Sequence, residues 1–522
     1  MNKAASTIPA VGIDLGTTYS VVACLDEQER PRSIVNGEGD LLTPSVVLFE
    51  GDQVIVGREA VKAMAVDADQ VADCPKRFLG RRMYPRPLHG QEWPPEALEA
   101  WVLDKLRRDA SRTVGNFRHA VITVPAYFDE VRRKATQDAG YMAGLDVLDI
   151  INEPTAAAVA FGMAEGFLDE RGEAKRPINI LVYDLGGGTF DVTVMRLEGG
   201  HFQTLSTDGD FQLGGKDWDQ RLVDFVAAEF MKRYQVDPRD DLSAAARIWR
   251  ECEEAKRTLS LRGKATIAAD YQGNWIRLEI TRAEFESMTR DLLERTTFTC
   301  REAISAAGLS WDDVDRVLLV GGSTRMPQVK EMLAELSGRA PDDSISPDEA
   351  VAHGAAIRAG AILAAHAGRP PRLKIRNVNS HSLGVVGKDP KTLRSRTGIL
   401  IPRNTPLPAS ATRTFRTQKA DQRSILLQIV EGENPDPIYN SQVGRCTVPN
   451  LPKGLPAGQP ILVSFEYEEN GRLSVHVRVE GTDVELAHEL NRENSLAQAD
   501  LDRYRKQISG LPPQVIALAT PI

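Results

Sequence analysis

Short apolar runs alternate with longer amphipathic stretches from the N-terminus to about residue 365. The runs VGIDL, AVITVPA, INILVYDL and VDRVLLVGG are rich in β-branched residues, and helical patterns separate them. This alternation predicts an α/β domain of parallel strands with crossover helices. One predicted helix, AAARIWRECEEAKRTLS, has a single apolar face made by Ala245, Ile248, Cys252, Ala255 and Leu259.

The pattern changes after the last alanine-rich helix. Residues 367–379 contain two prolines and four basic residues where the helical period ends, which predicts a linker. From about residue 380 to 486, alternating apolar and polar runs are broken by Gly, Pro and an Asn-Gly pair at 470–471. They predict an all-β module with a hairpin at that pair. The tail from about residue 493 has room for one helix at most.

Two distant segments repeat one pattern: an apolar strand, an Asp, a Gly-rich turn and a second apolar strand. VGIDLGTTYSVV begins at residue 11 and LVYDLGGGTFDVTV at residue 181. Small turn residues let main-chain N–H groups approach an anion beside the carboxylate that ends the strand. The repeat predicts a duplicated half-domain that closes on one nucleotide triphosphate. In this predicted site, Thr17, Thr18 and Thr189 would supply hydroxyls for the phosphates, and Asp14, Asp184 and Asp191 would hold Mg²⁺.

A single turn of this kind is also found as an ordinary tight hairpin, so the phosphate interpretation depends on the pair. A third Gly-rich strand exit, LLVGGSTRMP at 318–327, precedes a helical pattern, as an adenosine-contacting loop would. Other nucleotide motifs fit less well. The segment GDFQLGGKD is a near miss to G-x-x-x-x-G-K-[ST], and no strand is followed by G-x-G-x-x-G.

Composition and charge narrow the function classes. The 522 residues allow two to four domains, and 42% apolar residues are ordinary for a globular protein. A net charge of -9 with interspersed signs argues against nucleic acid as a partner. The chain lacks a run of 18 apolar residues and a signal-like N-terminus, so we expect a cytoplasmic protein without a membrane partner. The five cysteines lack zinc-ligand spacing.

Nine motifs follow one another across nearly all of residues 9–365: IDLGTTYSVV, PKRFLGRR, VITVPAYFDEVRRKAT, IINEPTAAAVAFG, VYDLGGGTFDVTV, LGGKDWD, ECEEAKRTLS, LVGGSTRMP and SPDEAVAHGAA. In this order they closely resemble the heat-shock 70 kDa (DnaK-type) chaperone family, within the actin and sugar-kinase ATPase clan. The resemblance implies an α/β actin-like, ribonuclease H-like duplicated ATPase domain followed by an all-β sandwich. It further implies a stress-response chaperone that hydrolyses ATP to switch its affinity for unfolded polypeptides.

The resemblance also implies roles for individual residues. The catalytic residues would be Lys76, Glu153, Asp184 and Thr189. The metal ion would be held through water molecules by Asp14, Asp184 and Asp191. The nucleotide would be bound by Gly16, Thr17, Thr18, Tyr19, Gly186, Gly187, Gly188, Gly214, Gly215, Glu253, Lys256, Arg257, Ser260, Gly321, Gly322, Ser323, Arg325 and Asp348. Without the family, Lys76 reads as a surface lysine, Glu153 as a helix cap, and the polar stripe of the helix at 244–260 as a solvated face.

Two further sets of residues follow from the resemblance. Pro125 and Arg133 match the pair that passes the nucleotide state to the neighbouring domain. The β-module match is weaker and rests on HSLGVV, LIPRNTPLP, TFRT, IVEGE and LPAGQPILVSFEYEENGRLSV. Peptides of the family lie extended in a cleft whose pocket Val385, Phe415 and Ile425 would line here. Without the family, these three are ordinary core residues.

The prediction divides the chain into four parts: an ATPase domain at 1–366, a linker at 367–379, a β-sandwich at 380–486 and a tail at 487–522. The tail is expected to hold at most one helix and no full lid, so that bound peptide exchanges quickly. The expected cofactors are ATP or ADP with Mg²⁺, and K⁺ as a further candidate. The expected partners are unfolded or extended polypeptide segments, a J-domain cochaperone with altered charges and a nucleotide exchange factor.

The sequence departs from the family in several places. In the linker segment LKIRN, Lys374 and Arg376 interrupt an apolar run and Asn377 replaces an acid, which predicts weaker linker docking. Asp149 stands where the family commonly has a basic residue that receives the cochaperone. Lys388 and Gln418 replace apolar residues over the peptide site, and the basic loop GKDPKTLRSRTG predicts a preference for less apolar or acidic segments.

Two other function classes are weighed against the chaperone. An ATP-binding scaffold or regulatory protein would hold ATP as a structural ligand and leave the domains uncoupled, although the intact acids and Lys76 argue against a dead site. A metabolite kinase of the same clan would need a second-substrate pocket and a base aimed at a hydroxyl. The sequence offers no motif for either feature, and a kinase would have no use for the β-module.

Overall fold

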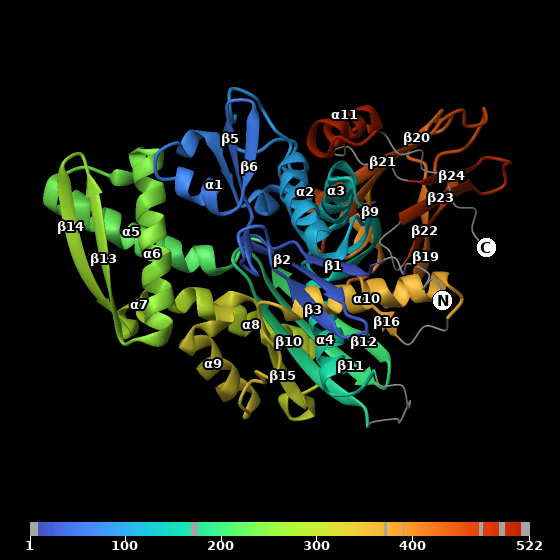
Figure 1. Cartoon of the computed structure of the whole chain (residues 1–522). Coiled ribbons are helices and arrows are strands. Elements are labelled where there is room, and N and C mark those ends of the chain that lie inside the picture. The colour runs from blue at the N-terminus through green and yellow to red at the C-terminus, as the bar shows by residue number, and fades with distance from the viewer. Residues whose placement is uncertain are drawn as a thin grey trace.

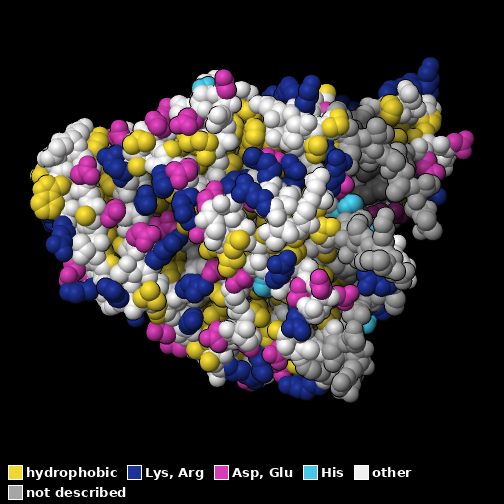
Figure 2. Space-filling view, in the orientation of Figure 1, with side chains coloured by type: hydrophobic (Ala, Val, Ile, Leu, Met, Phe, Trp, Pro, Cys, Tyr) yellow, Lys and Arg dark blue, Asp and Glu magenta, His cyan; other side chains and the backbone are white. Residues whose placement is uncertain are grey.

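The computed structural model describes residues 9–168, 176–369, 373–389, 391–468, 473–489 and 496–512. Two mixed sheets with their helices make up the larger part of the molecule, and a β-sandwich makes up the smaller part (Figure 1). Figure 2 shows Lys and Arg side chains interspersed with Asp and Glu side chains over the described part of one face. Among the described helices, none combines the length and the apolar character needed to cross a bilayer.

The first sheet carries the first Asp-Gly turn. Its strand order is β3-β2-β1-β8-β9, with β4 paired to β2. Strands β1, β2 and β3 are antiparallel, whereas β8 and β9 extend the sheet in parallel from β1. The bounds are β1 Val11–Asp14, β2 Tyr19–Leu25, β3 Pro31–Ile34, β4 Thr43–Pro44, β8 His119–Val124 and β9 Asp146–Asn152.

The second sheet repeats this arrangement around the second turn, with the order β15-β10-β11-β12-β16. Its strands β10, β11 and β12 are antiparallel, and β15 joins β10 in parallel. The repeat confirms the duplicated actin-like α/β fold. The runs predicted to be parallel strands do pair in parallel, β1 with β8 and β10 with β15. The strand after each turn is antiparallel, because a four-residue turn is too short for a crossover. The bounds are β10 Ile178–Leu185, β11 Phe190–Glu198, β12 His201–Asp210, β15 Arg316–Val320 and β16 Lys374–Arg376.

Two helices connect the duplicated sheets. Helix α10 packs on β1 and β2 of the first sheet and on α4, which packs on β10 of the second. Both are rich in alanine and glycine because the backbones touch: a Cβ on Gly354 would lie 1.8 Å from the Ala156 carbonyl oxygen. The ATPase-domain helices are α1 Arg58–Ala63, α2 Pro95–Val114, α3 Glu130–Met142, α4 Glu153–Ala164, α5 Gly215–Tyr234, α6 Leu242–Leu261, α7 Arg282–Met288, α8 Arg290–Ala306, α9 Pro327–Ser337 and α10 Ala350–His366.

Local sequence signals explain where several helices begin. Asp241 caps α6 by accepting from the Ala244 amide at 2.7 Å, and Thr281 with Glu284 forms a capping box on α7. The predicted apolar face of α6 is buried from Ile248 onward. The first buried residue of the helix is Ala244, not Ala245 as predicted. Two small sheets complete the domain: β5 Val46–Glu50, β6 Gln53–Val56 and β7 Val71–Asp73, then β13 Lys264–Tyr271 and β14 Asn274–Thr281.

The sandwich consists of two four-stranded antiparallel sheets, ordered β18-β17-β20-β21 and β19-β22-β23-β24. The inward residues of both sheets form one apolar core. The Asn-Gly pair at 470–471 lies outside the described residues, although the strands before and after it pair as antiparallel neighbours. The bounds are β17 Leu383–Lys388, β18 Ser395–Ile401, β19 Ala409–Arg416, β20 Ile425–Glu431, β21 Ser441–Val448, β22 Pro460–Tyr467, β23 Leu473–Val479 and β24 Glu485–Glu489.

Two segments join the sandwich to the ATPase domain. Strand β16, which lies just before the sandwich, pairs in parallel with β12 and thereby extends the second sheet. After the sandwich, helix α11 (Gln498–Ser509) returns to pack on α2 and α3 (Figure 1). Its apolar side chains Leu501, Tyr504 and Ile508 are buried in the core of the first sheet. The sandwich is thus anchored to the ATPase domain from both ends.

Candidate functional site

The two Asp-Gly turns meet between the sheets. A Cβ on Gly187 would lie 1.9 Å from the Thr18 Oγ1, and one on Gly188 would lie 2.3 Å from the Thr17 Cγ2. Larger residues would force the turns apart. The Thr18 Oγ1 is buried and has no hydrogen-bond partner among the described residues. A buried hydroxyl without a partner is rare in folded proteins, and a phosphate oxygen would satisfy it.

Four carboxylates converge beside the turns. Asp14 ends β1, Asp184 lies in β10, Asp191 lies in β11, and Glu153 is the first residue of α4. Burial and the neighbouring Glu153 carboxylate raise the pKa of Asp14 and of Asp191 to about 7. Burial and the same neighbour raise the pKa of Asp184 well above its usual range. The cluster therefore holds more negative charge than its own cation neutralises.

That cation is Lys76, in a 3-10 turn at Pro75–Phe78. Its side chain is 1% exposed, and its Nζ donates to the Glu153 Oε1 at 2.6 Å and to the Leu15 carbonyl. Although burial lowers the pKa of Lys76, the Glu153 and Asp14 carboxylates outweigh it and raise the pKa. The interpretation of Lys76 as a surface residue is therefore wrong. The neighbouring Arg77 donates to the Gly188 carbonyl at 3.1 Å, a contact that sequence reasoning missed.

Sequence reasoning also missed Glu99, on α2. The side chain is fully buried, and neither carboxylate oxygen has a well-aligned hydrogen-bond donor among the described residues. Burial raises the pKa of Glu99 to about 8, although the charge of Lys76 partly offsets the shift. A Glu among Ala and Leu in a helical pattern was the available signal. Its position near Lys76 could not be inferred because α2 begins about 20 residues later in the chain.

The polar stripe of α6 faces the turns on the other side. Lys256 donates to the Gly215 carbonyl at 2.9 Å and pairs with Asp219 at 2.8 Å. Arg257 donates to the Tyr19 hydroxyl at 2.8 Å and to Glu253 at 2.6 Å, so it connects α6 to the first turn. Ser260 bonds back to the Lys256 carbonyl at 3.2 Å. These contacts contradict the interpretation of the stripe as only a solvated face.

The third Gly-rich loop completes the group. Ser323 donates to the Gly186 carbonyl at 2.9 Å, and a Cβ on Gly215 would lie 2.3 Å from the Ser323 Oγ. Gly321 has a φ of +80°, which favours glycine, and its position beside the Leu185 carbonyl leaves no room for a side chain. Arg325 pairs with Asp348 at 2.5 Å, and Asp348 also packs against Gly322. The structure thus brings the predicted nucleotide residues into one connected group.

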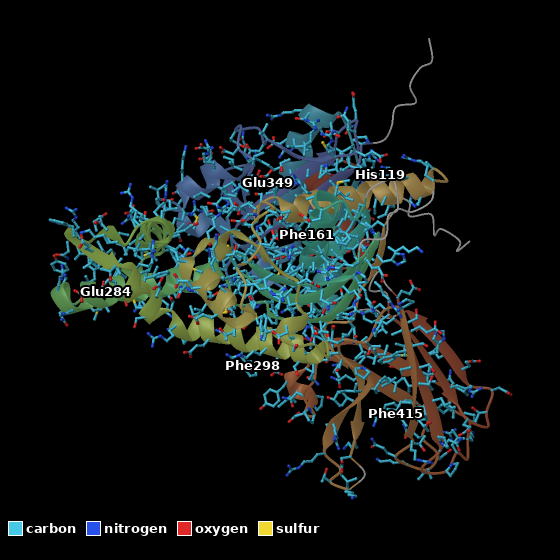
Figure 3. The ribbon with its side chains drawn as sticks, turned by 90° about the horizontal axis from the view of Figure 1, so that it is seen from below. His119, Phe161, Glu284, Phe298, Glu349 and Phe415 are labelled. Atoms are coloured by element: carbon cyan, nitrogen blue, oxygen red, sulfur yellow. The ribbon has the colours of Figure 1, made fainter. Side chains whose placement is uncertain are left out.

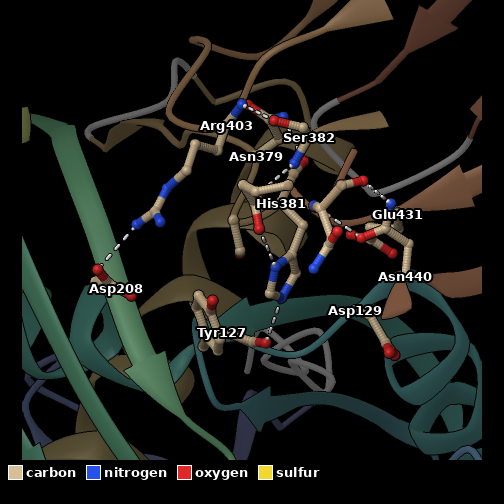
Figure 4. Close-up of polar contacts among 12 residues, drawn as sticks. Tyr127, Asp129, Asp208, Asn379, His381, Ser382, Arg403, Glu431 and Asn440 are labelled. Carbon is tan, nitrogen blue, oxygen red and sulfur yellow. Dashed lines mark hydrogen bonds and ion pairs between the residues drawn. The ribbon is translucent and has the colours of Figure 1, made fainter. Parts of the chain in front are cut away.

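A short segment connects this group to the sandwich. Asp191 accepts the amides of Ala126 at 3.2 Å and of Tyr127 at 3.0 Å. The carbonyls of the same two residues face the sandwich: Ser380 donates to that of Ala126, and the His381 Nε2 lies 3.0 Å from that of Tyr127 (Figure 4). Two residues therefore separate an acid of the site from the start of the sandwich.

Pro125 and Arg133 flank this segment. Pro125 precedes Ala126 directly, and the guanidinium of Arg133 donates to the Ala126 carbonyl at 3.2 Å. Arg133 also donates to the Phe128 carbonyl at 3.1 Å and to the Asn152 Oδ1 at 2.6 Å. Because Asn152 precedes Glu153, Arg133 braces the segment against the start of α4.

Other contacts hold the sandwich on the ATPase domain. Arg403 pairs with Asp208 at 3.0 Å (Figure 4), and the Glu130 amide donates to the Glu431 Oε2 at 3.0 Å. The His381 ring lies 4.2 Å from the Tyr127 ring, centroid to centroid. Sequence reasoning did not find these residues. The Glu that ends the apolar strand at 425–431 was a signal, because a charged residue there needs a partner.

The predicted peptide residues lie within the sandwich, away from the turns. Val385 is 1% and Ile425 is 6% exposed, so both belong to the core. Phe415 is half-buried and lies over Gly387 and Gly398 of the opposite sheet. Figure 3 shows Phe415 among the sandwich strands, apart from Phe161 in the ATPase domain. Phe415 is therefore the member of the set that solvent reaches most readily.

Two positions that depart from the family have partners in the structure. Asp149 pairs with Arg358 of α10 at 2.8 Å. Asn377 accepts from the hydroxyls of Thr155 at 3.2 Å and Thr204 at 3.4 Å, next to the docked β16. The basic residues Lys374 and Arg376 on either side of Ile375 are exposed and leave the pairing of β16 intact.

Comparisons with known proteins agree with this architecture. A model of the family described as Hsp70 protein matches residues 10–89 and 85–511. The chaperone protein DnaK of Metamycoplasma hominis is 39% identical over 506 residues, and that of Deinococcus radiodurans is 38% identical over 525. Both alignments cover 95% of this chain and 81% of the relative. The DnaK of Halobacterium salinarum is 39% identical over 480 residues, which cover 90% of this chain and 73% of the relative. The chain therefore belongs to the Hsp70 family of ATP-dependent, DnaK-type chaperones.

Proposed function

We propose that this chaperone hydrolyses ATP between its two Asp-Gly turns. The observation that supports the site is the buried Lys76–Glu153 pair, at 2.6 Å, beside three further carboxylates whose pKa values are raised. Water would attack the γ-phosphate in line, oriented by Lys76, Glu153 and Thr189. Phosphoryl transfer requires mainly positioning and charge neutralisation, so no covalent nucleophile is needed.

We propose that Asp14, Asp184 and Asp191 hold Mg²⁺ through its waters. Hard oxygen donors with raised pKa values suit a hydrated divalent cation, which would restore their ordinary ionisation. When bound, the ion would neutralise charge on the phosphates. K⁺ stays a prediction of the resemblance.

The nucleotide would be held from three directions. We assign the phosphates to Gly16, Thr17, Thr18, Tyr19, Gly186, Gly187, Gly188, Gly214 and Gly215, and the nucleoside to Glu253, Lys256, Arg257, Ser260, Gly321, Gly322, Ser323, Arg325 and Asp348. The partnerless Thr18 hydroxyl supports the phosphate assignment.

The nucleotide state would reach the sandwich through Asp191, Ala126 and Tyr127. A ligand that repositions the Asp191 carboxylate changes what the two amides donate to, and so biases the contacts with Ser380 and His381. Pro125 and Arg133 would keep the segment in one of two positions. ATP would thereby set the affinity of the sandwich for extended segments of unfolded proteins.

The remaining assignments are proposals from the same family. The chain would divide into an ATPase domain at 1–366, a linker at 367–379, a sandwich at 380–486 and a tail at 487–522. Val385, Phe415 and Ile425 would shape the peptide site, with Phe415 touching the peptide. The protein would work in the cytoplasm with an exchange factor and with a J-domain partner whose charges complement Asp149.

The test of the catalytic assignment is single-turnover hydrolysis by Lys76→Ala. We expect a rate loss of about 100-fold or more, because a preorganised charge at the transferring phosphate is removed. Nucleotide binding, measured by calorimetry, should persist. The matched control is Lys62→Ala on α1, whose side chain is 57% exposed, and it should hydrolyse ATP like the parent. A Lys76→Ala protein with the parent rate would overturn the assignment.

A further inference from the structure

One edge of the sandwich is open for main-chain pairing. Within the described residues, β19 pairs only with β22. The Thr417 amide donates to the Gln459 carbonyl of the neighbouring chain segment at 3.0 Å. In an antiparallel pair, every second residue directs its N–H and C=O groups toward the partner strand. The main-chain groups of Thr414 and Arg416 therefore point away from β22. An extended segment of another chain can add to such an edge through its own main chain.

The side chains beside this edge form a small apolar surface. Phe415 projects from β19 toward the opposite sheet, and a Cβ on Gly398 would lie 3.4 Å from its ring, one on Gly387 3.7 Å. Gly398 pairs with the core residue Val385 in the register of β17 and β18. Because both glycines lack a side chain, the Phe415 ring is covered only partly and stays half-buried. A small apolar side chain of a bound segment could rest there.

Arginines surround this apolar surface. The Arg413 guanidinium lies 5.9 Å from the centroid of the Phe415 ring and donates to the Ile399 carbonyl at 2.9 Å. Arg396 pairs in register with Gly387 and therefore shares its face of the sheet. Arg396 approaches Asp389 only at 3.6 Å. In the described part of the chain, no carboxylate lies within ion-pair distance of Arg413, Arg416 or Lys388, and Arg416 donates instead to the Gly458 carbonyl at 2.9 Å.

The charge of this region is opposite to that of the whole chain. Residues 388–423 contain nine Lys or Arg and two Asp or Glu, whereas the net charge of the chain is -9. One arginine that points inward on an edge strand could serve only to prevent unwanted strand pairing. That explanation covers Arg413, but it leaves the other basic residues along the same edge unexplained. A guanidinium that lacks a close carboxylate partner favours one, because it can bind a carboxylate through two parallel hydrogen bonds.

We propose that the β19 edge of the sandwich selects extended polypeptide segments that carry Asp or Glu next to a small apolar residue. The segment would pair with Thr414 and Arg416, place its apolar side chain against Phe415, and bring its carboxylates to Arg413 and Arg396. This inference rests on the proposed function, because it names the class of segment that the peptide site prefers.

Fluorescence anisotropy with labelled peptides tests the proposal on the full chain. Three peptides share one central Leu-Val-Ala and carry flanking Asp, Asn or Lys. We expect the Asp peptide to bind about tenfold more tightly than the Asn peptide at 50 mM salt, with the Lys peptide weakest, since each of the two exposed arginines contributes about threefold and the two factors multiply. The preference should shrink as salt rises to 300 mM.

Matched substitutions locate the effect. Arg413→Gln and Arg396→Gln should each bring the ratio of Asp-peptide to Asn-peptide affinity down to about threefold or less, and the double variant to near one. Arg478→Gln, at an exposed position on β23, should keep the parent ratio. Thermal unfolding of each variant verifies the fold of the sandwich.

Each outcome has a distinct meaning. Equal binding of the Asp and Asn peptides, or tighter binding of the Lys peptide, would overturn the charge preference while leaving the proposed function intact. If none of the peptides binds in either nucleotide state, the proposed function itself fails. Tighter binding of a single-stranded RNA oligomer than of the Asp peptide would assign the basic edge to nucleic acid and overturn the proposal.

Discussion

At the scale of single residues, the site depends on groups that are costly to bury and that the nucleotide would satisfy. Lys76 can neutralise one of the four carboxylates that surround it, and the Thr18 hydroxyl has no partner among the described residues. Such groups persist when function requires them, because their burial reduces stability. The glycines of the two turns are also required by the site, because any larger residue would keep the main chains of the turns apart.

Gly187→Ala should weaken ATP binding. The added Cβ would lie 1.9 Å from the Thr18 Oγ1, so the two turns must separate where the phosphates bind. We expect an affinity loss of about tenfold to 100-fold, because a displacement near 1 Å disrupts several phosphate contacts at once. Isothermal calorimetry with ATP measures it. Gly263→Ala, where a Cβ meets no atom within 4 Å, is the control and should bind ATP normally. Equal affinity of both variants would contradict the role of the turns.

Sequence patterns predicted most of this site and little of its surroundings. The turn residues, Lys76 and Glu153 lie in short motifs with a local signature, so reading along the chain finds them. Tyr127, His381 and Glu431 have no such signature, since their roles come from contacts across about 250 and 300 residues of sequence. Val385 and Ile425 show the opposite limit, because an apolar strand residue fits a pocket and a core equally well.

At the scale of elements, the chain returns to its first sheet at the end. Helix α11 follows the sandwich but buries its apolar face on α2 and α3, while the Tyr141 hydroxyl donates to Asp502 at 2.6 Å. The periodicity of the tail predicted a helix but not its destination, because an amphipathic face does not specify which surface covers it. Strand β16 illustrates the same point, since a three-residue run between prolines and the sandwich becomes part of the ATPase sheet.

Tyr504→Ala should destabilise the packing of α11 on the ATPase domain. The side chain is 5% exposed and lies 6.0 Å from the Trp93 ring, centroid to centroid. Removing a buried aromatic ring costs about 3 kcal/mol. Hydrogen exchange should therefore report faster opening of α11 and of the neighbouring α3. Lys506→Ala, at an exposed position of the same helix, should leave exchange nearly unchanged. Unaltered protection in Tyr504→Ala would show that the helix is not held by this face.

At the scale of the whole molecule, buried ionisable groups join the domains. Burial raises the pKa of Glu431 to about 8. Burial lowers the pKa of His381, but its hydrogen bond to Glu433 and the nearby carboxylates outweigh this effect and raise it. The groups that face them from both domains are Tyr127, Asp129, Arg133, Asp208, Arg403 and Glu433. Docking of the sandwich therefore takes up protons at both residues.

Docking should accordingly weaken as pH rises. The docked pKa of Glu431 lies above its ordinary value of about 4.5, so its contribution is complete below that value and lost as pH rises through about 8. His381 acts in the same direction. Energy transfer between dyes on the two domains should fall from pH 6 to pH 8.5. Glu431→Gln keeps an acceptor for the Glu130 amide and should flatten most of this dependence. A docked fraction that rises with pH would contradict the assignment.

The most direct test of the central claim is single-turnover ATP hydrolysis with and without unfolded peptides. The parent protein should hydrolyse ATP about fivefold or more faster with peptide, within the usual range of coupling between sites. A Ser380→Ala, His381→Ala variant loses both contacts to the Ala126 and Tyr127 carbonyls. It should still hydrolyse ATP but ignore peptide, while Lys76→Ala should show neither activity. A parent rate that no peptide changes, or full acceleration in the double variant, would contradict a path from Asp191 to the sandwich.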